Sequence, residues 1–344
     1  MDLRELDGRR VLVTGGTGFV GRHLVRTLAE GSDAAIRLLV RSAMTPEDLP
    51  AAVRGRAGLV RSDLGEPEGL AAACTGADIV LHAAAVMPGQ PGARLSLEDY
   101  RRVNVTGTLT LALLAAEAGA RRFVFVSSTA AMGAPPVPEV DETTPCRPTS
   151  PYEVTKRAAE EGLLELGQRT GLEVVIVRPC LIAGEGQRGG VLLKLFRLCR
   201  KGMFPVFGGR LDVQKPLVDV EDVAQALLLA AIRGRAGEIY LVTSGVRHTL
   251  REMLEIAGSL VGNPRPWRDI PLPLARAAAF LTTPVAKAVG IEPPLSPERL
   301  DLFMADRAID IGKARRELGY APHYRDLRSM LARTYAWYGM SGQL

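Results

Sequence analysis

The chain has 344 residues, 47% of them hydrophobic, which is enough apolar content to form a full core without disulfides or a structural metal. Its 43 basic and 38 acidic residues are interspersed, so the formal charge of +5 does not gather in the patch or tail typical of nucleic-acid binding. The four cysteines stand singly and no signal-peptide pattern opens the chain, which predicts a cytoplasmic protein with neither a metal site nor a disulfide framework.

Short apolar runs alternate with helical segments along the first half of the chain. Runs rich in β-branched residues predict strands at 11–14, 36–40, 59–60, 79–83, 123–127 and 174–177. Between several of them lie Ala- and Leu-rich segments with helical periodicity, such as 22–30 and 106–118. This alternation predicts an α/β fold, in which βαβ units form a doubly wound parallel sheet with helices on both faces.

The second half of the chain is less regular. Gly- and Pro-rich connections follow residue 178, although 217–231 has the pattern of a strand entering a helix and 238–243 that of another strand. We predict a first domain over residues 1–180, to which 216–245 returns, and a smaller C-terminal α/β lobe over 181–344.

The segment 271–291 is apolar enough to raise the question of a membrane. Pro273, Arg276, Pro284 and Lys287 interrupt it, so it falls short of the uninterrupted apolar run that a membrane-spanning helix needs. The pattern favours two short amphipathic helices that cover an apolar pocket, and weak contact with a membrane surface stays an alternative.

A glycine-rich turn follows the first predicted strand. The segment 14–21 reads TGGTGFVG, and a helix is predicted from Arg22. Gly15 permits a tight turn, Gly18 lets backbone N–H groups approach a pyrophosphate, and Gly21 allows close packing of helix on strand. The helix N-terminus favours the negative charge of phosphates. This context predicts a Rossmann domain that binds a nicotinamide dinucleotide, with the C-terminal lobe holding the substrate.

The end of the second predicted strand indicates which dinucleotide is bound. A carboxylate at this point hydrogen-bonds the ribose 2′-hydroxyl of NAD, whereas a 2′-phosphate needs a cation. The strand ends in Arg41 and Ser42, so NADP(H) is favoured, with Arg22 as a second cation, and NAD(H) stays possible. Asp63, after the third strand, is placed either to contact the adenine edge or to cap a helix.

A capped helix carries a tyrosine and a lysine. Ser150, Pro151 and Glu153 form a helix start with a capping box. Tyr152 and Lys156 then stand four residues apart on one helical face. A nearby ammonium, helped by the cationic nicotinamide, is expected to lower the pKa of the phenol so that it exchanges a proton with a substrate while hydride moves.

The strand predicted at 123–127 ends in hydroxyl groups at the carboxyl edge of the sheet, where ligands bind in open α/β folds. We expect Ser128 to hold and polarise the reacting oxygen. Ser127 and Thr129 are the competing candidates, and capping of the turn after the strand is their alternative role.

These motifs together resemble the extended short-chain dehydrogenase/reductase superfamily, which includes NAD-dependent epimerases and dehydratases. The matching segments are 14–21, 63–64, 82–85, 104–108, 127–128, 152–156, 178–179, 218–224 and 310–320. The resemblance implies Ser128, Tyr152 and Lys156 as catalytic residues, with Asn104 supporting them through a water. It also implies cofactor contacts from Gly15, Thr17, Gly18, Phe19, Val20, Gly21, Arg41, Ser42, Asp63, Leu64, Ala83, Ala84, Ala85, Tyr152, Lys156 and Pro179, and a homodimer.

Departures from the pattern bear on the substrate. Nucleotide-sugar enzymes of this superfamily usually carry an Asn where this chain has Leu181, a Tyr where it has Met132 and an Arg where it has Lys215. The chain is more similar to the hydroxysteroid dehydrogenase and dihydroflavonol reductase branches, which implies oxidation or reduction of a bulky, apolar secondary alcohol or ketone. Met87, Ser128, Thr129, Leu181 and Ile182 are the expected substrate contacts.

Two alternatives remain. Lys215 and Arg210 can bind a diphosphate, which keeps a UDP-sugar 4-epimerase as the second hypothesis. The third is a dinucleotide-binding regulator without catalysis, although such proteins often lose the Tyr or the Lys that this chain retains.

Overall fold

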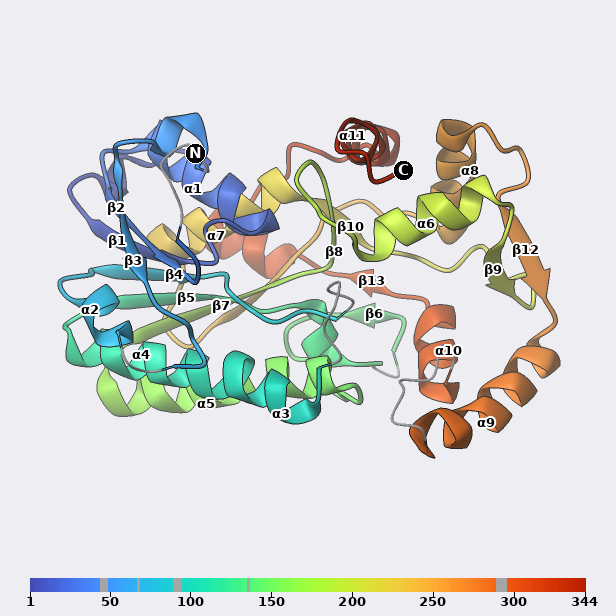
Figure 1. Ribbon diagram of the computed structural model, residues 1–344, viewed down its shortest axis with the longest axis horizontal. Helices are drawn as coiled ribbons and strands as arrows, with labels where there is room; N and C mark the ends of the chain where they lie inside the picture. The colour runs from blue at the N-terminus through green and yellow to red at the C-terminus, as the bar shows by residue number, and fades with distance from the viewer. Residues whose placement is uncertain (44–48, 67–68, 89–94, 135–136, 289–295) are drawn as a thin grey trace.

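The computed structural model describes residues 1–43, 49–66, 69–88, 95–134, 137–288 and 296–344. Its centre is a seven-stranded sheet in the order β11-β7-β5-β4-β1-β2-β3, in which every neighbouring pair is parallel (Figure 1). The strands are β1 (Arg10–Thr14), β2 (Ala35–Val40), β3 (Ala57–Arg61), β4 (Ile79–His82), β5 (Arg122–Val126), β7 (Glu173–Pro179) and β11 (Ile239–Val242). The predicted doubly wound α/β fold is confirmed.

Helices cover both faces of this sheet. One face carries α1 (Phe19–Gly31) and α7 (Val220–Arg233), and the other carries α2 (Leu70–Cys74), α4 (Thr108–Glu117) and α5 (Pro151–Thr170) (Figure 1). Val11 and Val13 of β1 join the core on the α1/α7 face, while Leu12 joins the core on the opposite face. Alternate side chains are therefore buried on both sides, which is why the strands read as continuous apolar runs.

Helix boundaries differ from the sequence-based expectation at two places. α1 begins at Phe19 rather than at Arg22, directly after the glycine turn. The helical segment expected at 106–118 begins earlier, with α3 (Leu97–Tyr100) and a π-helical stretch at Arg101–Gly107 that runs into α4. A capping box of Ser96 and Asp99 starts this longer segment, and apolar periodicity does not report such a cap.

The C-terminal lobe packs α6 (Gly190–Arg200), α8 (Leu250–Val261) and α11 (Leu327–Met340) around a core of its own. Three further sheets within the described residues have two strands each. They pair β8 (Leu181–Ala183) with β10 (Leu217–Asp219), β9 (Phe204–Phe207) with β12 (Trp267–Ile270), and β6 (Glu139–Val140) with β13 (Ala308–Ile309). Within 216–245, β11 and α7 belong to the central sheet and its cover, whereas β10 lies outside that sheet.

The apolar segment expected to form two short helices forms one, α9 (Leu272–Ala288), which continues through Pro284 and is followed by α10 (Pro297–Met304). The hydroxyls of Thr282 and Thr283 donate to the carbonyls of Ala278 and Ala279 in the turn before the proline. These side-chain bonds stabilise the turn in which Pro284 supplies no N–H. No helix within the described ranges is both long enough and apolar enough to span a membrane.

The turn between β1 and α1 is packed so closely that glycine is required. Gly15 has a φ of +68°, and a Cβ on it would lie 2.6 Å from the backbone nitrogen of Ala84. A Cβ on Gly21, in the first turn of α1, would lie 2.0 Å from the carbonyl oxygen of Gly15. Helix and strand therefore touch through bare backbone at this point.

A buried ion pair joins three elements beneath the carboxyl edge of the sheet. The Arg178 guanidinium in β7 donates from Nε and Nη2 to the Glu160 carboxylate in α5, at 2.8 and 2.6 Å. The Ser127 hydroxyl, at the end of β5, donates to the same carboxylate at 2.5 Å. Both charged side chains are almost completely buried, so the position of α5 on the sheet is fixed by bonds that water cannot replace.

Arg178→Met removes both guanidinium bonds to the buried Glu160 carboxylate, which then keeps only the half-buried Arg157, at 3.5 Å, as an ion-pair partner. We expect this variant to lose about 3–5 kcal/mol of unfolding free energy, measured by urea denaturation. Arg251→Met removes an exposed pair with Asp212 and should lose less than about 1 kcal/mol. Equal losses in the two variants would contradict the structural role of the buried pair.

Gly21→Ala forces a methyl group against the Gly15 carbonyl, so we expect a loss of about 2–3 kcal/mol in unfolding free energy. The matched control is Gly58→Ala in β3, where a Cβ meets nothing within 4 Å and the backbone is not left-handed. That variant should be neutral or slightly stabilising. A stable Gly21→Ala protein would show that helix and strand can separate here without cost.

Candidate active site

The candidate site lies at the carboxyl ends of β1, β4 and β5. The strand order reverses between β1 and β4, which are neighbours in the sheet but not in the chain. Connections leave the sheet in opposite directions at such a point, and the crevice between them is where ligands bind in this type of fold. The glycine turn follows β1, residues 83–86 follow β4, and Ser127 and Ser128 follow β5.

The glycine turn fits a dinucleotide pyrophosphate. Helix α1 begins at Gly18 without any side-chain cap and has no acidic residue in its first turn. By contrast, α5 and α8 both begin with capping boxes in which a glutamate bonds the helix start. The first N–H groups of α1 thus have no side-chain partner, and the N-terminus of the helix favours phosphate oxygens.

A buried histidine supports this turn, although in the sequence it appears only within one of the matching segments. His82, at the end of β4, is hydrogen-bonded through Nδ1 to the Thr14 hydroxyl at 2.6 Å and through Nε2 to the Thr108 hydroxyl at 2.9 Å. The Thr14 hydroxyl also accepts a bond from the Ala84 N–H. Burial lowers the pKa of His82 to about 3, so the imidazole is neutral and links β1, β4 and α4.

Asn104 holds the loop that follows β4. Its side-chain oxygen accepts from the Val86 N–H at 2.8 Å, and its side-chain nitrogen donates to the Val86 carbonyl at 3.0 Å. The side chain is buried and acts here as a brace for residues 83–86. The structure describes this direct contact of Asn104 with the loop, and the support of the catalytic residues through a water that the resemblance implies stays a prediction.

Tyr152 and Ser128 meet at the end of β5. The Tyr152 side chain, in the first turn of α5, is buried and is hydrogen-bonded to Ser128. Ser128 also caps the short helix 129–132, because its hydroxyl accepts from the Ala130 N–H at 3.1 Å. Of the competing hydroxyls, Ser127 is turned to Glu160 instead. Tyr100 of α3, not foreseen from the sequence, lies edge-on to Tyr152 with the ring centroids 6.3 Å apart.

Lys156 is buried one turn further along α5. Its ammonium donates to the Val126 carbonyl at 2.9 Å and lies 4.6 Å from the centre of the Phe125 ring. Burial lowers the pKa of Lys156 to about 8, and the charge of Glu160 partly opposes that fall. The Lys156 side chain is therefore hydrogen-bonded to the end of β5, beside Ser128 and Tyr152.

The expected lowering of the tyrosine pKa is wrong for the protein without ligand. Burial raises the pKa of Tyr152 well above its usual value, the neighbouring Tyr100 raises it further, and only the bond to Ser128 lowers it. The physical reason is that the site is dry, so forming a phenolate there costs more than forming it in water. The phenol is thus protonated at neutral pH and able to donate a proton.

The residues expected to contact the adenosine part of the cofactor lie in different parts of the structure. Arg41 and Ser42 are exposed at the end of β2. Arg22 donates to the Thr17 carbonyl at 3.2 Å and lies close to Gly186 in the C-terminal lobe, and its expected role as a second cation for the 2′-phosphate stays a prediction. Asp63 accepts from the Gly65 N–H, which makes it the start of a turn rather than the cap of a helix.

The remaining expected contacts surround this region. Thr17 and Phe19 border the glycine turn, and Val20, Ala83, Ala84 and Ala85 are half-buried around it. Leu64 and Pro179 are buried. Among the expected substrate contacts, Met87 is exposed after β4 and Thr129 is half-buried. Leu181 packs on the core of the C-terminal lobe, while Ile182 packs on the core of the sheet domain.

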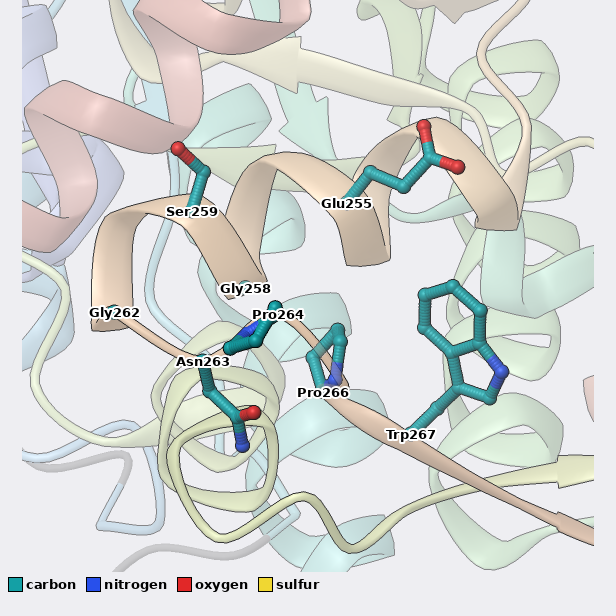
Figure 2. A pocket seen from close by; sticks show the side chains of 8 residues that line it. All are labelled: Glu255, Gly258, Ser259, Gly262, Asn263, Pro264, Pro266 and Trp267. Carbon is teal, nitrogen blue, oxygen red and sulfur yellow. The ribbon is translucent and has the colours of Figure 1, made fainter.

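A cavity of about 490 Å³ lies away from this site, between α8 and β12 (Figure 2). Glycine, proline and the Trp267 ring form much of its lining, with Glu255 at one side (Figure 2). None of its lining residues comes from the glycine turn or from the Ser128–Tyr152–Lys156 group, so its size alone gives it no part in the chemistry.

Three relatives cover most of the chain. It is 33% identical over 91% of its length, and 92% of the relative, to a 4-hydroxy-2-methyl-3-oxo-4-farnesyl-3,4-dihydroquinoline-1-oxide ketoreductase of Stigmatella aurantiaca. It is 30% identical to a 3-beta-hydroxysteroid dehydrogenase of Mycolicibacterium neoaurum, over 93% and 89% of the two chains. It is 28% identical to a UDP-glucose 4-epimerase of Vibrio cholerae, over 91% of each.

A solved structure with a bound cofactor shares the fold. The dTDP-glucose 4,6-dehydratase of Streptomyces venezuelae, which contains NAD, superposes with a TM-score of 0.75 at 29% identity, covering 96% of this chain and 97% of that one. Residues 11–243 also match the model of the NAD dependent epimerase/dehydratase family. This span includes the glycine turn, the buried histidine and the serine, tyrosine and lysine group. The chain is therefore an enzyme of the NAD dependent epimerase/dehydratase family, within the extended short-chain dehydrogenase/reductase superfamily.

Proposed function

We propose that this enzyme interconverts a ketone and a secondary alcohol on a bulky, apolar substrate, with Tyr152 as the general acid and base. The observation that carries this proposal is the buried phenol, which is protonated, hydrogen-bonded to Ser128 and within the same group as a buried ammonium. A dry, protonated phenol is suited to donate a proton to a carbonyl oxygen.

The chain's own residues divide the work of the reduction. The nicotinamide supplies the hydride when it is bound. Ser128 donates a hydrogen bond that holds and polarises the substrate carbonyl, and the Tyr152 hydroxyl gives its proton to that oxygen as the alcohol forms. Lys156 stabilises the resulting phenolate with its positive charge until the proton is replaced from solvent. Met87, Thr129, Leu181 and Ile182 are proposed to border the substrate.

The hydrogen bonds that the Lys215 ammonium makes within the chain favour an apolar substrate over a sugar nucleotide. Its ammonium donates to the carbonyls of Phe303 and Ala305, at 2.5 and 3.3 Å, and lies over the Phe303 ring. Two of the three N–H donors of this ammonium are thus used within the chain, which leaves a single one for a diphosphate. The ketoreductase and steroid dehydrogenase among the relatives support the same choice.

The second candidate is a nucleotide-sugar 4-epimerase, which the Vibrio cholerae relative supports. Parallel assays distinguish the two: oxidation of NADPH with steroid or other hydrophobic ketones, and epimerisation of UDP-glucose. Turnover of the sugar nucleotide alone would refute the reductase proposal.

Tyr152→Phe removes the proton donor and keeps the ring. We expect kcat for ketone reduction to fall by about 10²-fold or more, because general acid catalysis contributes on that order. Tyr335→Phe, in the C-terminal lobe, is the control and should leave kcat unchanged. Retained turnover in Tyr152→Phe would favour a different proton donor, and absence of any turnover in the unaltered enzyme would favour a binding protein.

The pH profile of ketone reduction should decline above about pH 8, because Lys156 loses its proton there and no longer stabilises the phenolate. Glu160 raises the pKa of Lys156, so Glu160→Gln should move the decline to lower pH. Measurement of kcat/KM against pH for both proteins tests this. A decline at unchanged pH in the variant would show that another group titrates.

NADP(H) is proposed as the preferred cofactor, since Arg41 directly follows β2 and none of the described residues 40–43 carries a carboxylate. Arg41→Ala should raise KM for NADPH about tenfold or more and change KM for NADH little, because the arginine contacts only the additional phosphate. Ser42→Ala is the neighbouring control. Equal changes for both cofactors would contradict this role of Arg41.

A further inference from the structure

Helix α9 has an apolar face that nothing within the described parts of the chain covers. Leu274, Phe280 and Leu281 are 64%, 75% and 67% exposed. Several large apolar side chains gathered on one exposed helix are unusual, because isolated ones are common but clusters mark sites of contact. Helix α9 lies at the outer end of the C-terminal lobe, away from β1 and α1 (Figure 1).

The opposite face of α9 is already occupied. Ala275 and Ala279 are buried, and Ala275 packs with Phe207, Leu300 and Met304, which come from β9 and α10. At about 100° per residue, Leu274, Phe280 and Leu281 each point roughly 120–140° away from the direction between these two alanines. The helix is therefore apolar on its inner and its outer side, and folding of this chain explains only the inner one.

The charge around the outer face identifies the occupant. From Ile270 to Ile291 the chain contains no acidic residue and two basic ones. Arg276 is exposed on α9 itself, and Arg265 and Arg268 are exposed shortly before it. Asp269 and Asp301 are exposed nearby on β12 and α10, but α9 itself carries no acidic residue. A surface helix with leucine and phenylalanine on one side, and with basic but no acidic residues of its own, matches the interface of a bilayer that contains anionic lipids.

A second copy of the chain fits this face less well. A symmetric dimer through α9 would bring Arg276 close to its own equivalent, because both subunits present the same patch in a two-fold contact. With no carboxylate on α9, nothing in the patch would neutralise these cations. Anionic headgroups satisfy the cations and the apolar side chains at once.

We propose that α9 lies on the surface of an anionic phospholipid bilayer and inserts Leu274, Phe280 and Leu281 at the boundary between headgroups and acyl chains. The helix does not cross the bilayer, since its inner face remains packed on α10 and it has 17 residues. This contact is independent of the proposed reaction, because it requires neither the cofactor nor the substrate.

Sedimentation with vesicles of equal parts phosphatidylcholine and phosphatidylglycerol tests the proposal. We expect the full chain to bind these vesicles, and to bind pure phosphatidylcholine vesicles more weakly. The double variant Phe280→Ser/Leu281→Ser should lose about tenfold or more of the partition coefficient, because two apolar side chains no longer enter the lipid. Arg276→Glu should weaken binding to the anionic vesicles only.

The matched control is Val191→Ser/Met340→Ser, which removes two apolar side chains of similar exposure from α6 and α11. It should bind vesicles like the unaltered chain, and unchanged thermal unfolding of both double variants shows that the fold is retained. Absence of vesicle binding, or equal binding by the two double variants, would overturn the proposal. So would sedimentation equilibrium showing a dimer that only Phe280→Ser/Leu281→Ser dissociates.

Discussion

Burial of the Lys156 ammonium against the end of β5 is the constraint on which the candidate site depends. A cation removed from water is costly unless nearby groups replace its hydration. Here the Val126 carbonyl, the Phe125 ring and the charge of Glu160 do so. Glu160 is fixed in turn by Arg178 and Ser127. Because these partners lie on β5 and β7, the charge at the site and the position of α5 are set by one network.

The dinucleotide half of the site depends on a different requirement, close contact between backbones. Gly15 and Gly21 allow β1, α1 and the loop after β4 to approach within distances that a methyl group would prevent. His82 of β4 joins β1 and α4 through the hydroxyls of Thr14 and Thr108. The side-chain oxygen of Asn104 accepts a hydrogen bond from the Val86 N–H and so holds the loop after β4. Neutral hydrogen bonds therefore hold the loop after β4. A buried ion pair holds α5, which carries Tyr152 and Lys156.

We propose that the C-terminal lobe supplies the substrate specificity. Its segments reach back to the sheet domain at several points, such as β11 beside β7 and His23 of α1 bonded to the Glu185 carbonyl. In the same lobe, Lys215 donates to the carbonyls of Phe303 and Ala305, at the C-terminal end of α10. An apolar substrate and an apolar outer helix are consistent with each other, since a ligand of that kind dissolves in lipid.

Local patterns in the sequence determined the strands, the glycine turn and the capped helix with Tyr152 and Lys156, because each depends on residues close together in the chain. Apolar runs placed all seven central strands, β11 included, and glycine spacing located the turn that we propose binds phosphate. Only the tertiary structure decided the charge states, since the pKa of Tyr152 rises with burial and that of Lys156 depends on Glu160. It also decided the partners of His82, Asn104 and Lys215 and the exposed side of α9, because those contacts join residues far apart in the chain.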